Sequence, residues 1–348
     1  MQRKEEFGPN GKLDRRKFLG TVAATGALAG SGSAIIPSLF GPTAFAQDAT
    51  AHGQTTETLV GELYKVLSEQ QKKSVCFDWN FQDPNRGLLR TFVANNWNIV
   101  PQEINSDFYT DDQRDLIKLI FESLIDKDWH ERYYQQLEDD AGGFGNEQSI
   151  AIFGTPGTGK FQLVMTGRHM TLRCDGDSTE HVAFGGPIFY GHAPEFNEGP
   201  NHTDNVFWDQ AVVANGLYKM LDGKQRDMAL LPKTPREQSV GFRGSKQIPG
   251  IRVEDLSGDQ KEHVQLVLRK LIEPYRQNDQ DEVIRCLKAQ GGLDACHLSF
   301  YQDADIGNDE VWDNWRLEGP SFVWHFRGSP HVHVWVNVAD SPSVELNA

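Results

Sequence analysis

Four short segments near the C-terminal end constrain the fold of this chain more than any other feature. Each has the composition of a β-strand, and short polar or glycine-containing turns separate one from the next. The segments are residues 297–302, 314–318, 322–327 and 331–338. Consecutive strands joined by short turns have to be antiparallel, because a parallel connection needs a crossover of about a dozen residues or more. The sequence therefore predicts an antiparallel meander at this end.

A second meander is predicted in the middle of the chain. Residues 149–153 and 161–174 are apolar strand candidates, and a Cys-Asp-Gly-Asp turn then leads to a third strand over 179–190. Residues 57–139 and 205–290 contain segments with the 3.6-residue periodicity of amphipathic helices. We therefore expect an α+β fold in which helices pack on an antiparallel sheet built from the central and C-terminal meanders.

Four helix starts are marked by a capping box. In this pattern a Ser, Thr or Asp caps the helix, and a Gln three residues later returns its side chain to the backbone of the cap. The pairs are Ser68/Gln71, Thr110/Gln113, Asp222/Gln225 and Ser257/Gln260. Their irregular intervals argue against a solenoid repeat, so they indicate separate helices of one domain.

The first 46 residues are predicted to be a targeting leader. Arg15 and Arg16 precede Lys-Phe-Leu, a mildly apolar run follows, and Ala-Phe-Ala at 44–46 supplies the small residues of a cleavage site. The paired arginines indicate the twin-arginine export machinery and a periplasmic or extracellular location after cleavage near Ala46. The apolar run is too short and too weakly apolar to span about 30 Å of hydrocarbon, so no stable membrane anchor is expected. The predicted division is a leader at 1–46, a linker at 47–58 and a single domain at 59–348.

Charge and cysteine content exclude some partners and leave one question open. The chain carries 34 basic and 49 acidic side chains, a net charge of −15, which repels phosphate backbones and argues against nucleic-acid binding. None of the four cysteines forms a CxxC motif. Cys286 and Cys296 flank a Gly-Gly turn and could form a disulfide in an oxidising compartment, with free buried thiols as the alternative.

Residues 154–160, Gly-Thr-Pro-Gly-Thr-Gly-Lys, are close to a phosphate-binding loop. However, Phe161 replaces the Ser or Thr that would hold magnesium, and the residues after it alternate as in a strand rather than a helix. We therefore interpret the segment as a Gly/Pro hairpin loop whose lysine is solvated.

The C-terminal strand contains the most informative candidate site. Side chains alternate along a strand, so His331 and His333 share one face with Trp335 and Asn337, while valines fill the other. Two histidines at this spacing can lean toward one point and bind a cation. Neutral imidazole suits zinc, copper or iron, so the pair predicts a transition-metal ion without naming it.

A third ligand would decide between a metal site and an ordinary polar strand face. His169, on the predicted central strand, is the first choice, and His192 and His202 near strand ends are the others. Glu318 is the candidate general base or orienting carboxylate for such a site.

The same residues carry a resemblance to the DUF3500 family of exported bacterial proteins without an assigned function. The motifs are Phe153-Gly-Thr-Pro-Gly157, Gly167-Arg-His-Met170, Gly186-Pro-Ile-Phe189, Trp315-Arg-Leu-Glu-Gly-Pro320 and His331-Val-His333. The resemblance spans roughly residues 59–340. Members usually show Gly-His-His-Leu in the central strand, whereas here Arg168 stands in the place of the first histidine and His169 matches the second. The resemblance supports the choice of histidines, and Arg168 could instead recognise an anionic ligand.

Two functions are expected from these patterns. The first is an exported metal-dependent enzyme for a small-molecule substrate, with His169, His331 and His333 on one ion and a position left open; an oxidoreductase is slightly favoured over a hydrolase. The second is a non-catalytic protein that binds a metal or small ligand, with the aromatic residues of the C-terminal strands lining a pocket.

Overall fold

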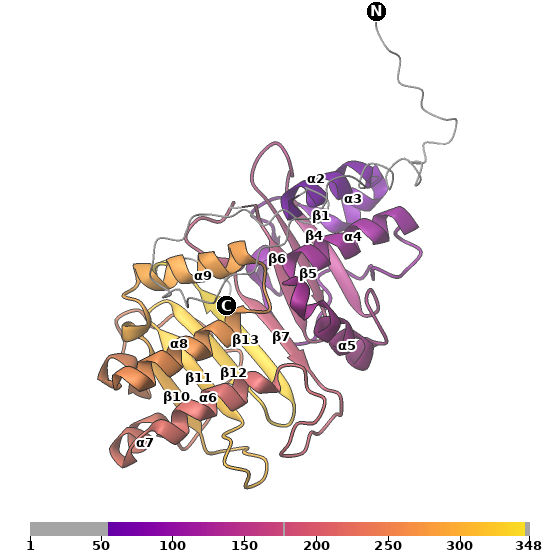
Figure 1. Cartoon of the computed structure of the whole chain (residues 1–348). Helices are drawn as coiled ribbons and strands as arrows, with labels where there is room; N and C mark the ends of the chain where they lie inside the picture. The colour runs from indigo at the N-terminus through magenta and orange to yellow at the C-terminus, as the bar shows by residue number, and fades with distance from the viewer. Residues whose placement is uncertain (1–54, 177, 345–348) are drawn as a thin grey trace, which may run out of the picture. The chain divides into compact units, whose positions relative to one another are not determined.

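The computed structural model describes residues 55–176 and 178–344 and contains an 11-stranded sheet with a separate two-stranded ribbon (Figure 1). The order in the large sheet is β1-β4-β5-β6-β7-β13-β12-β11-β10-β8, and β9 pairs with β10. The strands of the first half are β1 (Cys76–Phe77), β2 (Gln82–Asp83), β3 (Gly87–Leu88), β4 (Gln148–Gly154), β5 (Phe161–Gly167), β6 (Met170–Cys174) and β7 (Ile188–His192). Those of the second half are β8 (Leu230–Leu231), β9 (Ile251–Arg252), β10 (His297–Tyr301), β11 (Asn314–Gly319), β12 (Phe322–Arg327) and β13 (Val332–Val338).

Both predicted meanders are confirmed, and the α+β class with them. The central meander is β4 to β7, the C-terminal meander is β10 to β13, and the antiparallel pair β7–β13 joins them. The sheet is mixed rather than purely antiparallel, because β1 lies parallel to β4 and β8 lies parallel to β10. Each of these two-residue strands is followed by a long connection containing helices, which allows the chain to return in the same direction.

Four of the described helices begin where the capping boxes predicted. Their bounds are α2 (Thr56–Val66), α3 (Glu69–Val75), α4 (Asp111–Leu124), α5 (His130–Ala141), α6 (Trp208–Met220), α7 (Gly223–Ala229), α8 (Gly258–Ile272) and α9 (Gln277–Ala289). All four boxes are formed with both hydrogen bonds, at the starts of α3, α4, α7 and α8. The box glutamines also pair with each other between helices, Gln71 with Gln113 and Gln225 with Gln260. Each box therefore fixes a tertiary contact as well as a helix start.

The two halves of the sheet repeat the same succession of elements. Each half has two helices, a short parallel strand, an irregular crossing segment, two more helices and a four-stranded meander. The paired capping-box glutamines occur at matching places in both halves. The halves meet at β7 and β13, so the centre of the sheet lies between the last strands of the two meanders.

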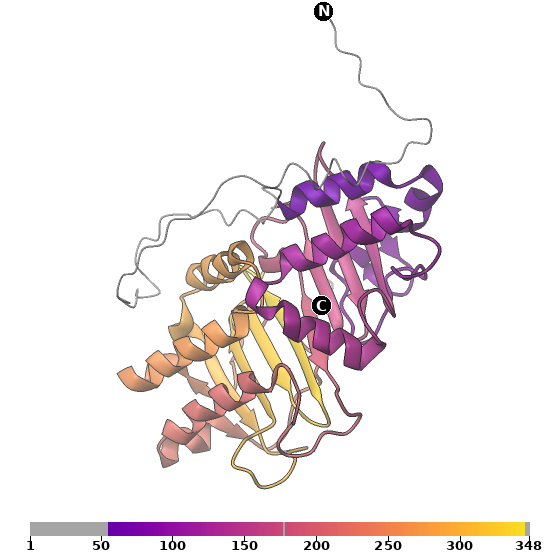
Figure 2. The same ribbon diagram turned by 45° about the vertical axis from the view of Figure 1, so that its right-hand side comes forward.

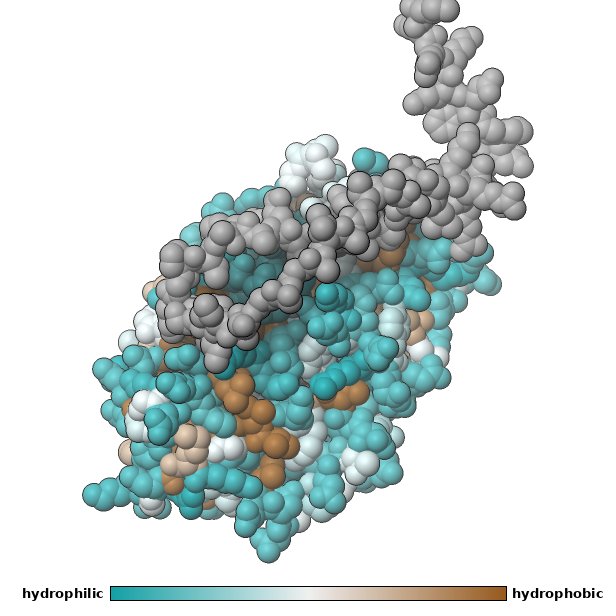
Figure 3. Space-filling model, in the orientation of Figure 1, coloured by the Kyte–Doolittle hydropathy of each residue, from teal (hydrophilic) through white to brown (hydrophobic). Residues whose placement is uncertain are grey.

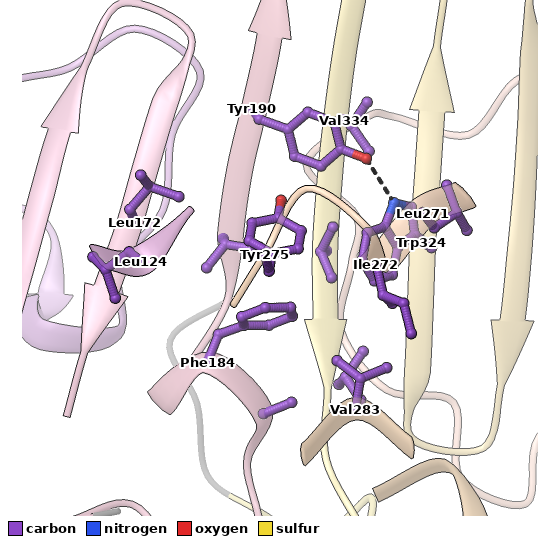
Figure 4. Packing of buried hydrophobic residues seen from close by; sticks show 14 of the residues in the cluster. Leu124, Leu172, Phe184, Tyr190, Leu271, Ile272, Tyr275, Val283, Trp324 and Val334 are labelled. Atoms are coloured by element: carbon purple, nitrogen blue, oxygen red, sulfur yellow. Dashed lines mark hydrogen bonds between the residues drawn. The ribbon is translucent and has the colours of Figure 1, made fainter. Parts of the chain in front are cut away.

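Both sets of helices cover the same face of the sheet (Figures 1 and 2). Between them and the strands lies the main core, in which Leu124 of α4 lies beside Leu172 of β6 and Leu271 of α8 lies beside Trp324 of β12 (Figure 4). The outward surface on this side is mainly hydrophilic, with separate hydrophobic patches (Figure 3). Irregular segments lie against the opposite face: Trp97 Nε1 donates to Thr171 Oγ1 in the first half, and residues 232–250 pack there in the second.

Several narrower expectations are settled by the structure. The segment 154–160 is the loop of the β4–β5 hairpin, as predicted, since Thr155 N donates to the carbonyl of Lys160. The strand predicted over 161–174 is instead two strands, and the one predicted over 179–190 begins only at Ile188. All four cysteines are free. Within the described residues, no helix is long and apolar enough to cross a membrane, and the predicted leader lies outside them.

Candidate metal centre

The β5–β6 hairpin places His169 at the end of strands β5 and β6. Gly167 and Met170 are register partners, so Arg168 and His169 form a two-residue turn. His169, the second central residue of this turn, has a φ of 53°, in the left-handed region that type II turns adopt at that position. Its backbone N–H donates to the Asn96 side chain at 3.2 Å. The turn therefore projects the imidazole beyond the end of β5 rather than from within a strand.

The other two imidazoles belong to His331, directly before β13, and to His333, the second residue of β13. His333 Nε2 lies 3.0 Å from His169 Nε2 and 3.0 Å from His331 Nε2. The three rings have centroids 4.8 to 5.2 Å apart. The expected convergence of His169 with His331 and His333 is therefore confirmed, and the group could hold a metal ion.

A glycine on β7 makes room for this convergence. Gly191 is the register partner of His333, and β7 lies between the β5–β6 hairpin and β13 in the sheet. A Cβ atom at Gly191 would lie 2.4 Å from the carbonyl oxygen of Val332 and 3.4 Å from the His169 ring. A side chain at Gly191 would therefore force β13 or the His169 ring to shift.

Each imidazole is oriented through its outer nitrogen. His169 Nδ1 lies 2.8 Å from Asp140 Oδ2, at the end of α5, and His333 Nδ1 lies 3.0 Å from Glu237 Oε2. His331 Nδ1 lies 3.0 Å from the Phe196 carbonyl oxygen. Carboxylate and carbonyl oxygens only accept, so all three Nδ1 atoms carry the proton. Such acceptors fix the tautomer and orientation of metal-binding histidines.

The three Nε2 atoms consequently face one another with their lone pairs. Two lone pairs at 3.0 Å repel unless a cation lies between them. Zinc bound tetrahedrally at about 2.0–2.1 Å from nitrogen sets neighbouring ligand nitrogens about 3.3 Å apart, close to the observed spacing. The arrangement therefore fits a shared metal ion better than a hydrogen-bonded set of rings.

Burial keeps His331 and His333 in the form that binds metals. Burial lowers the pKa of His331 to about 4, and His169 and Arg327 contribute in the same direction. Burial likewise lowers the pKa of His333 well below its usual value. Although burial raises the pKa of Asp140, its hydrogen bonds to His169 and Gln136 bring it below the usual value. Neutral imidazoles beside ionised carboxylates are the combination that a divalent cation requires.

One side of the cluster faces the surface. His331 is half-buried, whereas His169 and His333 are 2% and 4% exposed. The Phe196 ring lies 6.3 Å from the His331 ring and is 75% exposed. Arg168, next to His169, has its Nε 3.9 Å from Asp140 Oδ1 and a partly exposed side chain. A small molecule reaching the cluster would therefore meet an aromatic ring and a guanidinium group.

The structure does not bring His192 or His202 to this cluster. His192 Nε2 contacts Asp139 Oδ2 at 3.1 Å, and its Nδ1 accepts the N–H of Val206. His202 is buried between Glu198 at 2.7 Å and Asp313 at 2.8 Å. Although burial lowers the pKa of His202, these two carboxylates raise it to about 9, so it is a buried cation. A cavity of about 440 Å³ beside His202 is not lined by the three clustered histidines.

Glu318 also lies away from the cluster. It is 4% exposed and pairs with Arg243 Nε at 2.6 Å. It belongs to β11, two strands from β13, which corresponds to about 10 Å across the sheet. The structure therefore gives Glu318 a charge-pairing partner in place of contact with the histidines.

Sequence reasoning did not identify Asp140 and Glu237. Asp140 is the penultimate residue of α5, and Glu237 lies in the irregular segment between β8 and β9. The position of Asp140 just before a Gly-Gly helix end is a weak signal, and nothing in the sequence around Glu237 distinguishes it.

The Asp140→Asn variant tests the orienting role of this carboxylate. We expect its metal affinity to fall about 10- to 100-fold, because removing an outer-shell partner typically has that effect. The measurement is competition with a chromophoric chelator. Asp139→Asn is the matched control, since Asp139 is the neighbouring residue and contacts His192 instead. Equal losses in both variants would contradict a specific role for Asp140.

Comparison with known proteins gives a family match. A family model described as protein of unknown function (DUF3500) covers residues 49–338. No curated protein matches the chain, and no solved structure matches it.

Proposed function

The chain belongs to the DUF3500 family, and we propose that it is an exported protein whose three-histidine cluster binds one transition-metal ion and leaves a coordination position open for a small-molecule substrate. The observation that supports this most directly is the set of three Nε2 atoms facing one another, each on a ring whose Nδ1 is hydrogen-bonded. Three protein ligands plus one open position is the arrangement of catalytic rather than structural zinc sites.

The proposed reaction class is metal-dependent catalysis, with an oxidoreductase ahead of a hydrolase. Three neutral imidazoles suit copper, iron or zinc. Copper or iron would support oxidative chemistry, and zinc would lower the pKa of a bound water for hydrolysis. The twin-arginine motif at Arg15 and Arg16 favours the first, since export after folding allows a cofactor to be inserted beforehand.

The residues around the cluster would position the substrate. The half-buried ring of His331 marks the open side, where Phe196 offers an apolar surface. Arg168 supplies a guanidinium group next to His169, which suits a substrate carrying a carboxylate or phosphate.

The second candidate is a metal-binding protein without catalysis. The aromatic pocket that would favour small-ligand binding is not formed by the tryptophans of the C-terminal strands. Trp315, Trp324 and Trp335 are at most 1% exposed and belong to the core. The catalytic and the non-catalytic candidate then differ in one respect, which is whether the bound metal has an open coordination position.

Metal analysis of protein purified from the exported fraction tests the proposal. We expect one equivalent of a transition metal per chain, and a mature N-terminus near Gln47 in the same preparation. After replacement by Co²⁺, azide should change the visible absorption spectrum, because it occupies an open position. A bound metal that does not respond to azide would favour the non-catalytic candidate. Protein that neither contains nor takes up a stoichiometric metal would refute the proposal.

A further inference from the structure

Three unpaired hydrogen-bond donors lie in a row on the sheet face that residues 232–250 cover. Arg316, His325 and Trp335 are register partners on β11, β12 and β13, so their side chains share one face. They are 2%, 0% and 1% exposed. Arg316 Nη2, His325 Nε2 and Trp335 Nε1 have no hydrogen-bond partner among the described residues. We refer to these three residues as the donor row.

All three unpaired atoms carry hydrogen. Guanidinium and indole nitrogens of this kind only donate. His325 Nδ1 accepts a hydrogen bond from Arg316 Nε at 3.2 Å, which leaves the proton of the neutral ring on Nε2. Burial lowers the pKa of His325 well below its usual value, and Arg316 and Arg327 contribute, so the ring is neutral. What the donor row lacks is therefore an acceptor.

The charges on this face leave one positive charge in excess. Glu318 pairs with Arg243 at 2.6 Å and lies 3.8 Å from Arg316. Glu237 pairs with Arg327 at 3.3 Å. Three guanidinium groups thus share two carboxylates, and of the three only Arg316 is fully buried, since Arg243 and Arg327 are 33% and 20% exposed. A buried charge without full compensation is unfavourable, and a neutral partner such as water would satisfy the donors without balancing the charge.

The first half of the sheet shows how a buried arginine is satisfied by the protein alone. Arg173 is the fourth residue of β6, as His325 is the fourth residue of β12. Its Nε donates to the carbonyl of Pro187 at 2.7 Å, and its two Nη atoms donate to the carbonyls of Arg90 and Phe92. No corresponding carbonyl meets Arg316 Nη2 or His325 Nε2 among the described residues of the second half.

Apolar side chains of the covering segment pack over this region. Val240 and Phe242 pack with Phe189, Val323 and Trp335 in a small apolar cluster. Unpaired donors are more unfavourable in such a low-dielectric setting than near water. The same setting strengthens the attraction between a guanidinium and an anion.

We propose that the donor row of Arg316, His325 and Trp335 binds one small monovalent anion, with the compact acceptor chemistry of a carboxylate or a halide. The anion accepts the three N–H groups and neutralises the excess charge. None of the three residues of the donor row belongs to the three-histidine cluster, although Glu237, which pairs with Arg327 on this face, also accepts from His333.

Thermal unfolding of the full-length protein at constant ionic strength tests the site in solution. Sodium formate and sodium chloride are titrated separately against sodium gluconate, whose anion is too bulky for a buried row. A ligand that binds only the folded state raises the Tm with the logarithm of its concentration, so we expect a saturable rise for formate, chloride or both. The anion with the lower half-saturation concentration, formate or chloride, identifies a carboxylate or a halide as the natural occupant. No rise with either anion would overturn the proposal.

Two tryptophan variants provide the matched comparison. Trp335→Phe removes one donor of the row, and we expect the apparent Kd to rise about tenfold, the loss of one charge-assisted hydrogen bond. Trp315→Phe is the control: Trp315 Nε1 is also buried without a partner, and its ring stacks on Phe326, in the main core. If the apparent Kd for the anion were the same in Trp335→Phe and in the parent protein, the proposed site would be contradicted.

A crystallographic readout keeps the proposal testable if Trp335→Phe does not fold. Crystals of the parent protein grown with sodium bromide should show an anomalous peak within hydrogen-bond distance of Arg316 Nη2 and Trp335 Nε1. An ordered water at that position, with bromide only at the surface, would refute the proposal.

Discussion

Replacing His333 by alanine is expected to lower the metal affinity about 10²- to 10³-fold. His333 is the central histidine of the cluster, because its Nε2 lies 3.0 Å from both other Nε2 atoms. The binding free energy of zinc in four-ligand structural sites is about 10–16 kcal/mol, so each ligand contributes roughly 3–4 kcal/mol. Each 1.4 kcal/mol corresponds to a tenfold change in Kd. The measurement is the metal content after dialysis against a chelator, followed by a competition titration for the Kd.

His181→Ala is the control for this substitution. His181 is exposed and pairs with Asp340, and it contacts none of the three clustered histidines. Metal affinity should be unchanged in this variant. Far-UV circular dichroism of His333→Ala should match the parent, since the ring lies at the end of the sheet. Full metal retention by a folded His333→Ala protein would exclude the cluster as the binding site.

The C-terminal meander was predictable because its strands are long enough to show alternation and are separated by clear turns. The predicted strand at 322–327 coincides with β12. The parallel strands β1 and β8 have two residues each, too few for any periodicity. Their position depends on helices α3 and α7 and on the neighbouring meander strand, which are tertiary contacts that no local pattern encodes. The mixed character of the sheet was therefore missed.

The three-histidine cluster was predictable only in part. The His-x-His spacing on a strand indicated His331 and His333, and His169 was chosen as the third ligand. Its setting was wrong, because the residues around it were expected to form one continuous strand. The turn at Arg168 and His169 contains none of the Asn-Gly or Asp-Gly signals that mark hairpins, and contact with Asn96 stabilises it.

The carboxylates behind the imidazoles could not have been found from sequence. The chain has 49 acidic side chains, so the presence of an acidic residue carries little information. Asp140 and Glu237 reach the cluster from opposite layers, one from α5 and the other from the segment over the other face. Only the folded geometry distinguishes them from the rest.

The repeat of the two halves was also not predicted, although the four capping boxes that mark it were recognised in the sequence. The four capping boxes were recognised, but their irregular intervals argued against a repeat. The structure shows that the boxes form two equivalent glutamine pairs, Gln71 with Gln113 and Gln225 with Gln260. The three-histidine cluster occurs in only one of the two described halves, because the turn equivalent to Arg168 and His169 is Pro320 and Ser321 between β11 and β12. Ser321 offers no imidazole there.

The second large effect is expected from Trp324→Ala, which should lower the free energy of unfolding by about 3–5 kcal/mol. Trp324 is fully buried on β12, between the sheet and the helices (Figure 4). Its ring packs near Phe322 and Phe184, and its Nε1 donates to the hydroxyl of Tyr190 at 3.0 Å. The substitution removes this apolar contact area and leaves a cavity that the surrounding strands cannot close. Urea unfolding monitored by circular dichroism gives the free energy.

Two related variants separate the contributions of volume and hydrogen bonding. Trp324→Phe retains most of the ring and should lower the free energy of unfolding by less than the alanine variant. Tyr190→Phe keeps the ring at 190 but leaves Trp324 Nε1 without its acceptor, which should lower it by about 1–3 kcal/mol. Tyr190 lies on β7 directly opposite Val334, one residue from His333, so β7 links this core contact to the three-histidine cluster. A loss below about 1 kcal/mol for Trp324→Ala would show that the core relaxes around the cavity, and that packing at Trp324 does not hold β7 and β13 together.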